Sequence, residues 1–149
     1  MQSITTLHLS SNQLVGIMPA LAFPSNALPH LASLSLERIC FNTDDGPGCA
    51  ESFILLHRSH LTHLTLAECP LYGHDRTWAR PWAMILEGFA VQMTALRSVT
   101  VRELEYADED EGWGIMTHDA GAVEMDDAAD KEALRKLVAV VEARNLGND

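Results

Sequence analysis

The stretch Leu61–Leu71, LTHLTLAECPL, contains the pattern on which most of the chain is built. Leucines occupy its positions 1, 4, 6 and 11, and Cys69 occupies position 9. Positions 4 and 6 are apolar with a polar residue between them, and this alternation with a period of two is typical of a half-buried β-strand. The apolar residues on either side lie outside the short strand and are expected to turn the chain inward. The stretch therefore predicts a strand followed at once by a buried turn.

The same spacing occurs three more times along the chain. The other copies begin at Ile4, Leu31 and Leu96, so successive copies start 27, 30 and 35 residues apart. Stacked in register, position 4 of the copies forms one row of a parallel sheet: Leu7, Leu34, Leu64 and Val99. Unrelated buried strands of an α/β domain are the alternative, because L-x-x-L-x-L also arises by chance in a leucine-rich chain. The common register favours one repeated unit.

Two copies, ITTLHLSSNQL and LTHLTLAECPL, carry the signature L-x-x-L-x-L-x-x-N/C-x-L of leucine-rich repeats. The chain therefore resembles the leucine-rich-repeat superfamily, and its long, uneven spacing is similar to the irregular repeats of fungal F-box/leucine-rich-repeat proteins. The resemblance implies a short α/β solenoid, with four parallel strands on a concave face and helices or irregular loops on the convex face. It also implies that Asn12 and Cys69 hydrogen-bond to the backbone at the turn, a role that Ile39 and Leu104 do not match.

The chain divides into three regions. Residues 1–106 hold the four repeats, residues 107–126 an acidic loop, and residues 127–147 a helix that closes the C-terminal end of the stack. Residues 105–149 contain 13 acidic and 4 basic residues and so account for −9 of the net charge of −11. The run Asp108–Glu111 is expected to be a solvated loop, because its like charges repel one another.

Three helices are expected outside the strands. One covers about Cys49–His57, and a second begins with Pro81 at its first position. The second helix has an apolar stripe at helical spacing: Trp82, Ile85, Leu86, Phe89 and Met93. Residues 15–30 contain three prolines and are expected to be mostly irregular.

The third helix is expected to begin near Asp127 or Ala128, with Asp127 as its cap. Asp126, Asp130 and Glu132 would then lie near its positive end. Its apolar face consists of Leu134, Leu137, Val138 and Val141.

The outward positions of the stacked strands form the candidate binding surface. Their side chains are small and mostly hydroxylic, with charges at one edge, and they include no aromatic cluster of the kind that anchors tight interfaces. A merely solvated sheet face is the alternative to a docking surface. The tentative binding residues are Thr6, His8, Ser33, Ser35, Glu37, His63, Thr65, Ser98, Thr100 and Arg102.

The histidines and cysteines do not show the pattern of a metal site. Zinc sites use C-x2–4-C pairs or a histidine pair at i and i+4, and neither occurs here. The acidic run also lacks the alternating ligands of a calcium loop. We therefore predict no metal and no cofactor. This prediction covers all of the candidate metal ligands: Cys40, Cys49, Cys69, His57, His60, His63 and His74.

The sequence favours a non-enzymatic protein–protein interaction module. A Cys49–His57 pair in a small thiol-dependent hydrolase is an alternative, but no G-x-S-x-G motif or phosphate loop accompanies it. Trp78, Arg80 and Trp82 are a second cluster of interest, either packed over an apolar edge or binding a partner through a cation–π contact. The resemblance implies the target-binding region of an F-box-like adaptor, although no F-box is recognisable. A truncated fragment without independent activity is the third possibility.

Composition limits the partners and the compartment. The chain has no cluster of Lys and Arg, so neither nucleic acid nor an acidic membrane surface is expected as a partner. Three cysteines form no disulfide pattern, and the first residues, MQSITTLHL, do not read as a secretory signal. A protein partner and an intracellular location, cytoplasmic or nuclear, are the expectations.

Overall fold

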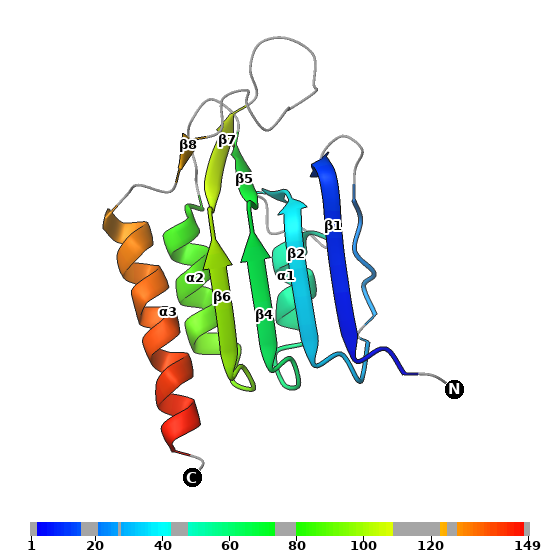
Figure 1. The fold of residues 1–149 in the computed structure, drawn as a ribbon, viewed down its shortest axis with the longest axis vertical. Coiled ribbons are helices and arrows are strands. Elements are labelled where there is room, and N and C mark those ends of the chain that lie inside the picture. Colours follow the sequence, from blue (N-terminus) through cyan, green and yellow to red (C-terminus); the bar gives the residue numbers. More distant parts are fainter. Residues whose placement is uncertain are drawn as a thin grey trace.

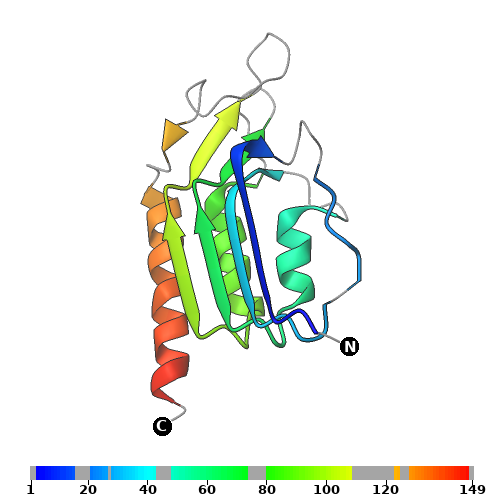
Figure 2. The same ribbon diagram turned by 45° about the vertical axis from the view of Figure 1, so that its right-hand side comes forward.

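The computed structural model describes residues 3–15, 21–26, 28–42, 48–73, 80–108, 123–124 and 128–147. These residues form a mixed α/β structure in which helices cover one face of a parallel sheet (Figures 1 and 2). None of its helices is long and apolar enough to span a membrane.

The main sheet has four parallel strands in the order β1-β2-β4-β6. They are β1 (Thr6–Val15), β2 (Ser33–Ile39), β4 (His63–Ala67) and β6 (Ser98–Arg102). Leu7 pairs with Leu34, Leu34 with Leu64, and Leu64 with Val99. The register predicted from the repeat spacing is therefore confirmed across all four strands.

A backbone contact repeats at the start of each strand and explains how this register is held. The carbonyl oxygen of Thr5 accepts hydrogen bonds from the N–H groups of Ala32 and Ser33, at 2.8 and 3.0 Å. The carbonyls of Ala32 and Thr62 do the same for the next strand along, at the same two distances. The contact uses the same repeat position each time, although the copies are separated by different lengths of chain.

A second, shorter sheet continues from the ends of these strands. It contains β3 (Phe41–Asn42), β5 (Pro70–Gly73), β7 (Glu105–Asp108) and β8 (Val123–Glu124), in the order β3-β5-β7-β8. The first three are parallel and keep the repeat register, whereas β8 runs antiparallel to β7. The sequence did not predict this sheet. Part of the region expected to be an acidic loop is therefore a strand, in which Val123 pairs with Tyr106.

Two helices pack behind the main sheet, and a third lies beside them. They are α1 (Ala50–Leu56), α2 (Trp82–Gln92) and α3 (Ala128–Leu146). Cys49 caps α1, because its sulfur accepts a hydrogen bond from the Ser52 N–H at 3.4 Å. Pro81 is the N-cap of α2, one position before the first helical position predicted for it. Helix α3 packs against α2 and also contacts β6 (Figure 1).

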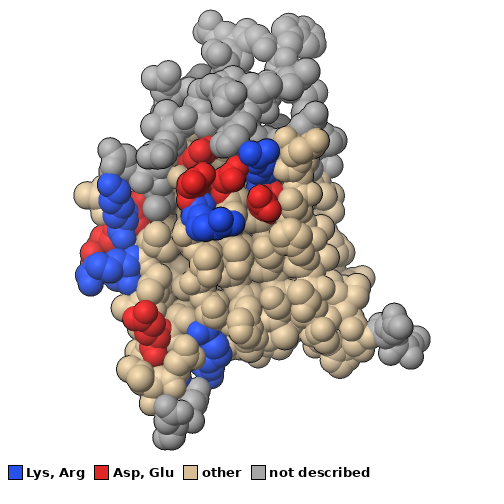
Figure 3. All heavy atoms as spheres, viewed as in Figure 1, with Lys and Arg blue, Asp and Glu red and all other residues tan. Residues whose placement is uncertain are grey.

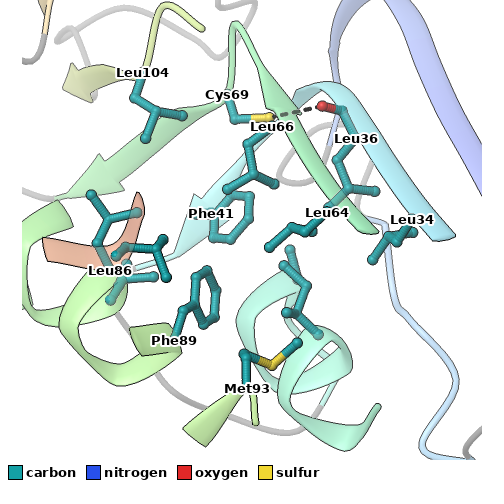
Figure 4. Close-up of a cluster of buried hydrophobic side chains, with 14 of the residues drawn as sticks. Leu34, Leu36, Phe41, Leu64, Leu66, Cys69, Leu86, Phe89, Met93 and Leu104 are labelled. Atoms are coloured by element: carbon teal, nitrogen blue, oxygen red, sulfur yellow. Dashed lines mark hydrogen bonds between the residues drawn. The ribbon is translucent and has the colours of Figure 1, made fainter. Parts of the chain in front are cut away.

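The core lies between the main sheet and α1 and α2 (Figure 4). The predicted α2 stripe is confirmed, since Trp82, Ile85, Leu86, Phe89 and Met93 are each 0% exposed. Burying a large apolar side chain contributes about 1.5–3 kcal/mol before entropic costs. On α3, Leu137 and Val141 are buried as expected, with Ala133 and Asp130 beside them on the same face.

The first repeat departs from the other three at both of its ends. Ile4 is 51% exposed, whereas Leu31, Leu61 and Leu96, at the equivalent position, are fully buried. The prediction that Ile4 packs into the interior is therefore wrong: β1 is the edge strand, and no further strand of the described residues lies beyond it.

Asn12 is also unlike its counterpart Cys69, because it is exposed within the continuous strand β1. Its backbone carbonyl accepts a hydrogen bond from Arg38 Nη1 at 3.3 Å. The expected equivalence of Asn12 and Cys69 at a buried turn is therefore not found. The described part of residues 21–30 has no helix or strand, as expected.

Candidate binding face

All ten predicted binding residues lie on the face of the main sheet opposite α1 and α2, and we call this set the binding face. Their strands pair in the predicted columns, with Thr6 beside Ser33, Ser33 beside His63, and His63 beside Ser98. Ser33, Ser35, Glu37 and Thr65 are partly exposed, and the other six are exposed. The structure thus brings these residues onto one surface.

Ala67 on β4 pairs with Glu37 on one neighbouring strand and with Arg102 on the other, but it is only 2% exposed. Its methyl group offers little surface between two longer neighbouring side chains. Next to His63 in the chain, the hydroxyl of Thr62 donates to the Ala32 carbonyl at 3.0 Å and lies 2.8 Å from His63 Nδ1. This contact orients the His63 ring at the exposed start of β4.

The residue that follows the regular part of three strands has an unusual backbone conformation. Arg38, Glu68 and Glu103 have φ angles of 58°, 49° and 50°. The left-handed region costs a residue other than glycine about 1–2 kcal/mol, because its Cβ crowds the following carbonyl. The three residues occupy the same repeat position, so the second, third and fourth repeats each turn from the main sheet into the second sheet at a left-handed corner.

These corners carry charged side chains, which together with the last strand residues form a charged ledge: Glu37, Arg38, Glu68, Arg102 and Glu103. Figure 3 shows acidic and basic side chains gathered near the end of the sheet face toward which the strands run, above an expanse of other residues. Arg38 Nε donates to Glu68 Oε2 at 2.7 Å, and both side chains are about one quarter exposed, at 26% and 25%. The hydrogen bond to Glu68 raises the pKa of Arg38, so this guanidinium stays charged.

Cys69 stands at the buried turn directly behind the ledge. Its thiol donates to the carbonyls of Ala67 at 3.3 Å and Leu36 at 3.5 Å (Figure 4). It therefore makes the backbone contacts that the repeat signature implied for it. Burial raises the pKa of Cys69 to about 11 and that of Cys40 to about 12. Both thiols are protonated at neutral pH.

Cys49 and His57, the pair considered for thiol chemistry, are each engaged with other groups. Cys49 Sγ lies 3.1 Å from the Ser52 hydroxyl. His57 is fully buried, with Nδ1 2.7 Å from the Phe53 carbonyl and Nε2 accepting from the Leu28 N–H at 2.9 Å. Accepting at Nε2 requires the neutral ring with its proton on Nδ1, and burial lowers the pKa of His57. His57 is therefore neutral and buried at the C-terminal end of α1, a position where a cation would otherwise be favourable.

His60 lies next to His57, with the ring centroids 5.3 Å apart. Its Nε2 is 3.3 Å from the Leu28 carbonyl, so the two histidines hold both polar groups of the Leu28 peptide unit. Their role here is to attach the irregular segment to the end of α1. No group of three His, Cys, Asp or Glu residues in the described part of the chain is arranged to hold a metal ion. His74 lies outside that part.

Arg80 and Trp82 contact residues of the protein interior and do not form an exposed pair on a loop. Arg80 makes a bidentate ion pair with Glu51, with both N–O distances 2.6 Å. Trp82 is buried beside Phe41, with the ring centroids 4.9 Å apart. Trp78 lies outside the described residues.

A buried network that the sequence did not indicate joins α2, α3 and the second sheet. Asp130 Oδ1 accepts from the Ala83 N–H at 2.7 Å, and Oδ2 accepts from the Tyr106 hydroxyl at 2.6 Å. The Tyr106 oxygen in turn accepts from the Trp82 N–H at 2.9 Å. Asp130, expected near the positive end of its own helix, thus satisfies N–H groups at the start of α2. The one signal in the sequence is Tyr106 at a repeat position held elsewhere by Phe or Leu.

Comparison of the chain with models of known protein families, with curated proteins and with solved structures found no match.

Proposed function

We propose that this chain is a short unit of the leucine-rich-repeat type that binds another protein through its binding face together with the adjoining charged ledge. The observation that carries the proposal is the row of left-handed corners at Arg38, Glu68 and Glu103. Glycine or asparagine would adopt that conformation with less strain, yet charged residues occupy all three positions. Strained positions that keep functional side chains are typical of recognition surfaces.

The rest of the binding face supports the same proposal. Hydroxyl and imidazole groups fill the columns below the ledge, where they can donate and accept hydrogen bonds. Among the described residues no helix covers this face, and it has few long side chains to immobilise, which lowers the entropic cost of docking. The partner surface that fits is polar and carries charges of both signs opposite the ledge. The resemblance to F-box/leucine-rich-repeat proteins suggests the target-binding part of an F-box-like adaptor as the wider role.

The test compares two single substitutions that add the same charge, one on the main sheet and one on the helices behind it. Thr65→Arg places a long cation at the centre of the binding face, whereas Met84→Arg places one on α2, where Met84 is 50% exposed. Both variants and the wild type are used as bait for proximity labelling in cells. We expect the proteins labelled by the wild type and by Met84→Arg to be lost with Thr65→Arg. Equal labelling by all three baits, with Thr65→Arg still folded, would rule out this face as the docking surface.

A further inference from the structure

The two edges of the main sheet are finished in different ways. At the β6 edge, Asn145 of α3 donates its side-chain amide to the Arg97 carbonyl at 2.7 Å. Arg97 holds the repeat position whose carbonyl, in Thr5, Ala32 and Thr62, receives the N–H groups of the following strand. Asn145 therefore takes the place of the N–H groups that a following strand would supply at this carbonyl, and α3 lies against the start of this edge.

The β1 edge has no neighbouring strand among the described residues. Because Thr5 directs its carbonyl to β2, the alternation of a parallel ladder directs the backbone groups of Thr6, His8 and Ser10 to the open side. All three residues are exposed. The irregularity in the β1–β2 pairing begins only after Ser10, so the outer edge is regular from Thr6 to Ser10.

The regular part of β1, residues 6–10, lacks the charges and the proline that usually protect a sheet edge. Natural edge strands avoid unwanted pairing through charged residues, proline or shortness. Strand β1 is 10 residues long and contains no proline, and residues 1–36 contain no Asp, Glu, Lys or Arg at all. Beside it, Ile4 is 51% exposed and Leu7 and Leu9 are only partly buried. An edge with these properties is suited to pairing.

We propose that β1 pairs with β1 of a second copy of this chain, in antiparallel orientation about a two-fold axis. Head-to-tail addition of β1 to another copy's β6 is disfavoured, because α3 contacts β6 and Asn145 already occupies the Arg97 carbonyl at the start of that edge. Two uncharged strands meet without repulsion, and the arrangement places α3, which lies next to β6 at the opposite edge of the sheet, on the far side of each copy. Symmetric pairing of identical surfaces is the usual geometry of soluble homodimers. This proposal concerns the sheet edge and does not depend on the proposed function of the face.

Analytical ultracentrifugation of the full chain tests the proposal directly. We expect a species of twice the 16.4 kDa chain mass that dissociates on dilution. His8→Lys, which adds a charge to the edge, is expected to weaken association at least tenfold. Thr100→Lys, which adds the same charge on β6, is the matched control and should leave it unchanged. Hydrogen exchange of the Thr6, His8 and Ser10 amides should slow as the dimer forms.

Three results would overturn the proposal. The first is a wild-type chain that is monomeric up to about 1 mM, a concentration at which even weak contacts are populated. The second is association weakened equally by His8→Lys and Thr100→Lys. The third is a dimer in which the β1 amides exchange as fast as in the monomer. A second variant, His8→Pro, removes an outward-directed N–H that the β1–β2 ladder does not use. If His8→Pro loses the dimer but melts like the wild type, the loss is one of strand pairing between copies and not of folding.

Discussion

The carboxylate of Asp130 on α3 accepts a hydrogen bond from the backbone N–H of Ala83 on α2, at 2.7 Å, between residues 47 positions apart in the chain. The first N–H groups of a helix have no partner within the helix and are normally capped by a residue just before it. Pro81, the N-cap of α2, makes no side-chain cap hydrogen bond. Asp130 supplies the cap from a distant element and so ties the C-terminal helix to the repeats.

Asp130→Ala should therefore destabilise the protein strongly. The substitution leaves the buried Ala83 N–H without an acceptor, which costs about 1–3 kcal/mol, and also removes a hydrogen bond of the partly buried Tyr106 hydroxyl. Urea denaturation measures the change in the free energy of unfolding. Glu142→Ala, at an exposed position of α3, is the control and should leave the midpoint unchanged. Equal midpoints for both variants would show that Asp130 does not cap α2.

The Arg80–Glu51 ion pair should contribute more stability than a surface pair of similar geometry. The Glu51 side chain is 7% exposed, whereas Glu132 in its pair with Arg135 is 44% exposed. Hydrogen bonds to charged groups that are shielded from water contribute about 1.5–3 kcal/mol, while exposed ion pairs are screened. We expect Glu51→Gln to lower the free energy of unfolding measurably and Glu132→Gln to have little effect. A larger effect of Glu132→Gln would contradict this reading of burial.

Stability should fall on mild acidification because of His57. Burial lowers its pKa below the ordinary value of 6.5, so the unfolded chain takes up the proton first as the pH falls. The stabilisation is complete above about pH 7 and is lost progressively as the pH falls through 6.5 toward the lower pKa of the folded state. Chemical denaturation between pH 7.5 and 5.5 measures this slope. His57→Gln should reduce it, whereas His63→Gln, at an exposed position, should not. An unchanged slope in His57→Gln would contradict a neutral, buried His57.

The three cysteines should differ sharply in reactivity. The thiolate is the reactive form, and burial raises the pKa of Cys40 to about 12 and that of Cys69 to about 11. Cys49 is partly exposed at the start of α1. Iodoacetamide at neutral pH, followed by mass spectrometry, should modify Cys49 first, and Cys40 and Cys69 only after unfolding. Rapid modification of Cys69 in the folded protein would show that the buried turn opens.

The parallel sheet could be predicted because its signal is local and repeated. Leu64 and Leu66 alternate with polar residues, and the same alternation in three other copies specifies both the strands and their register. The second sheet could not be predicted in this way. Strand β3 contains only Phe41 and Asn42, which is too short to show any alternation.

The details of the binding face were only partly readable from the sequence. The outward columns follow from strand alternation, but Arg38, Glu68 and Glu103 carry no sequence signal for a left-handed backbone, since that conformation favours glycine and asparagine. Asp130 does lie in the first turn of its helix, as predicted, but its buried contacts and those of His57 were not foreseen, for a related reason. Each lies near a helix end, where a charge usually interacts with its own helix, and tertiary packing buried both against other segments instead.

The repeated carbonyl contact at Thr5, Ala32 and Thr62 has a practical consequence for protein engineering. The same backbone acceptor starts each strand pairing, although different numbers of residues lie between the units. Additional units could thus be spliced between β2 and β4 with linkers of differing length and still add to the sheet in step. A longer repeat protein built in this way from identical units would extend the outward face by one strand for each unit added.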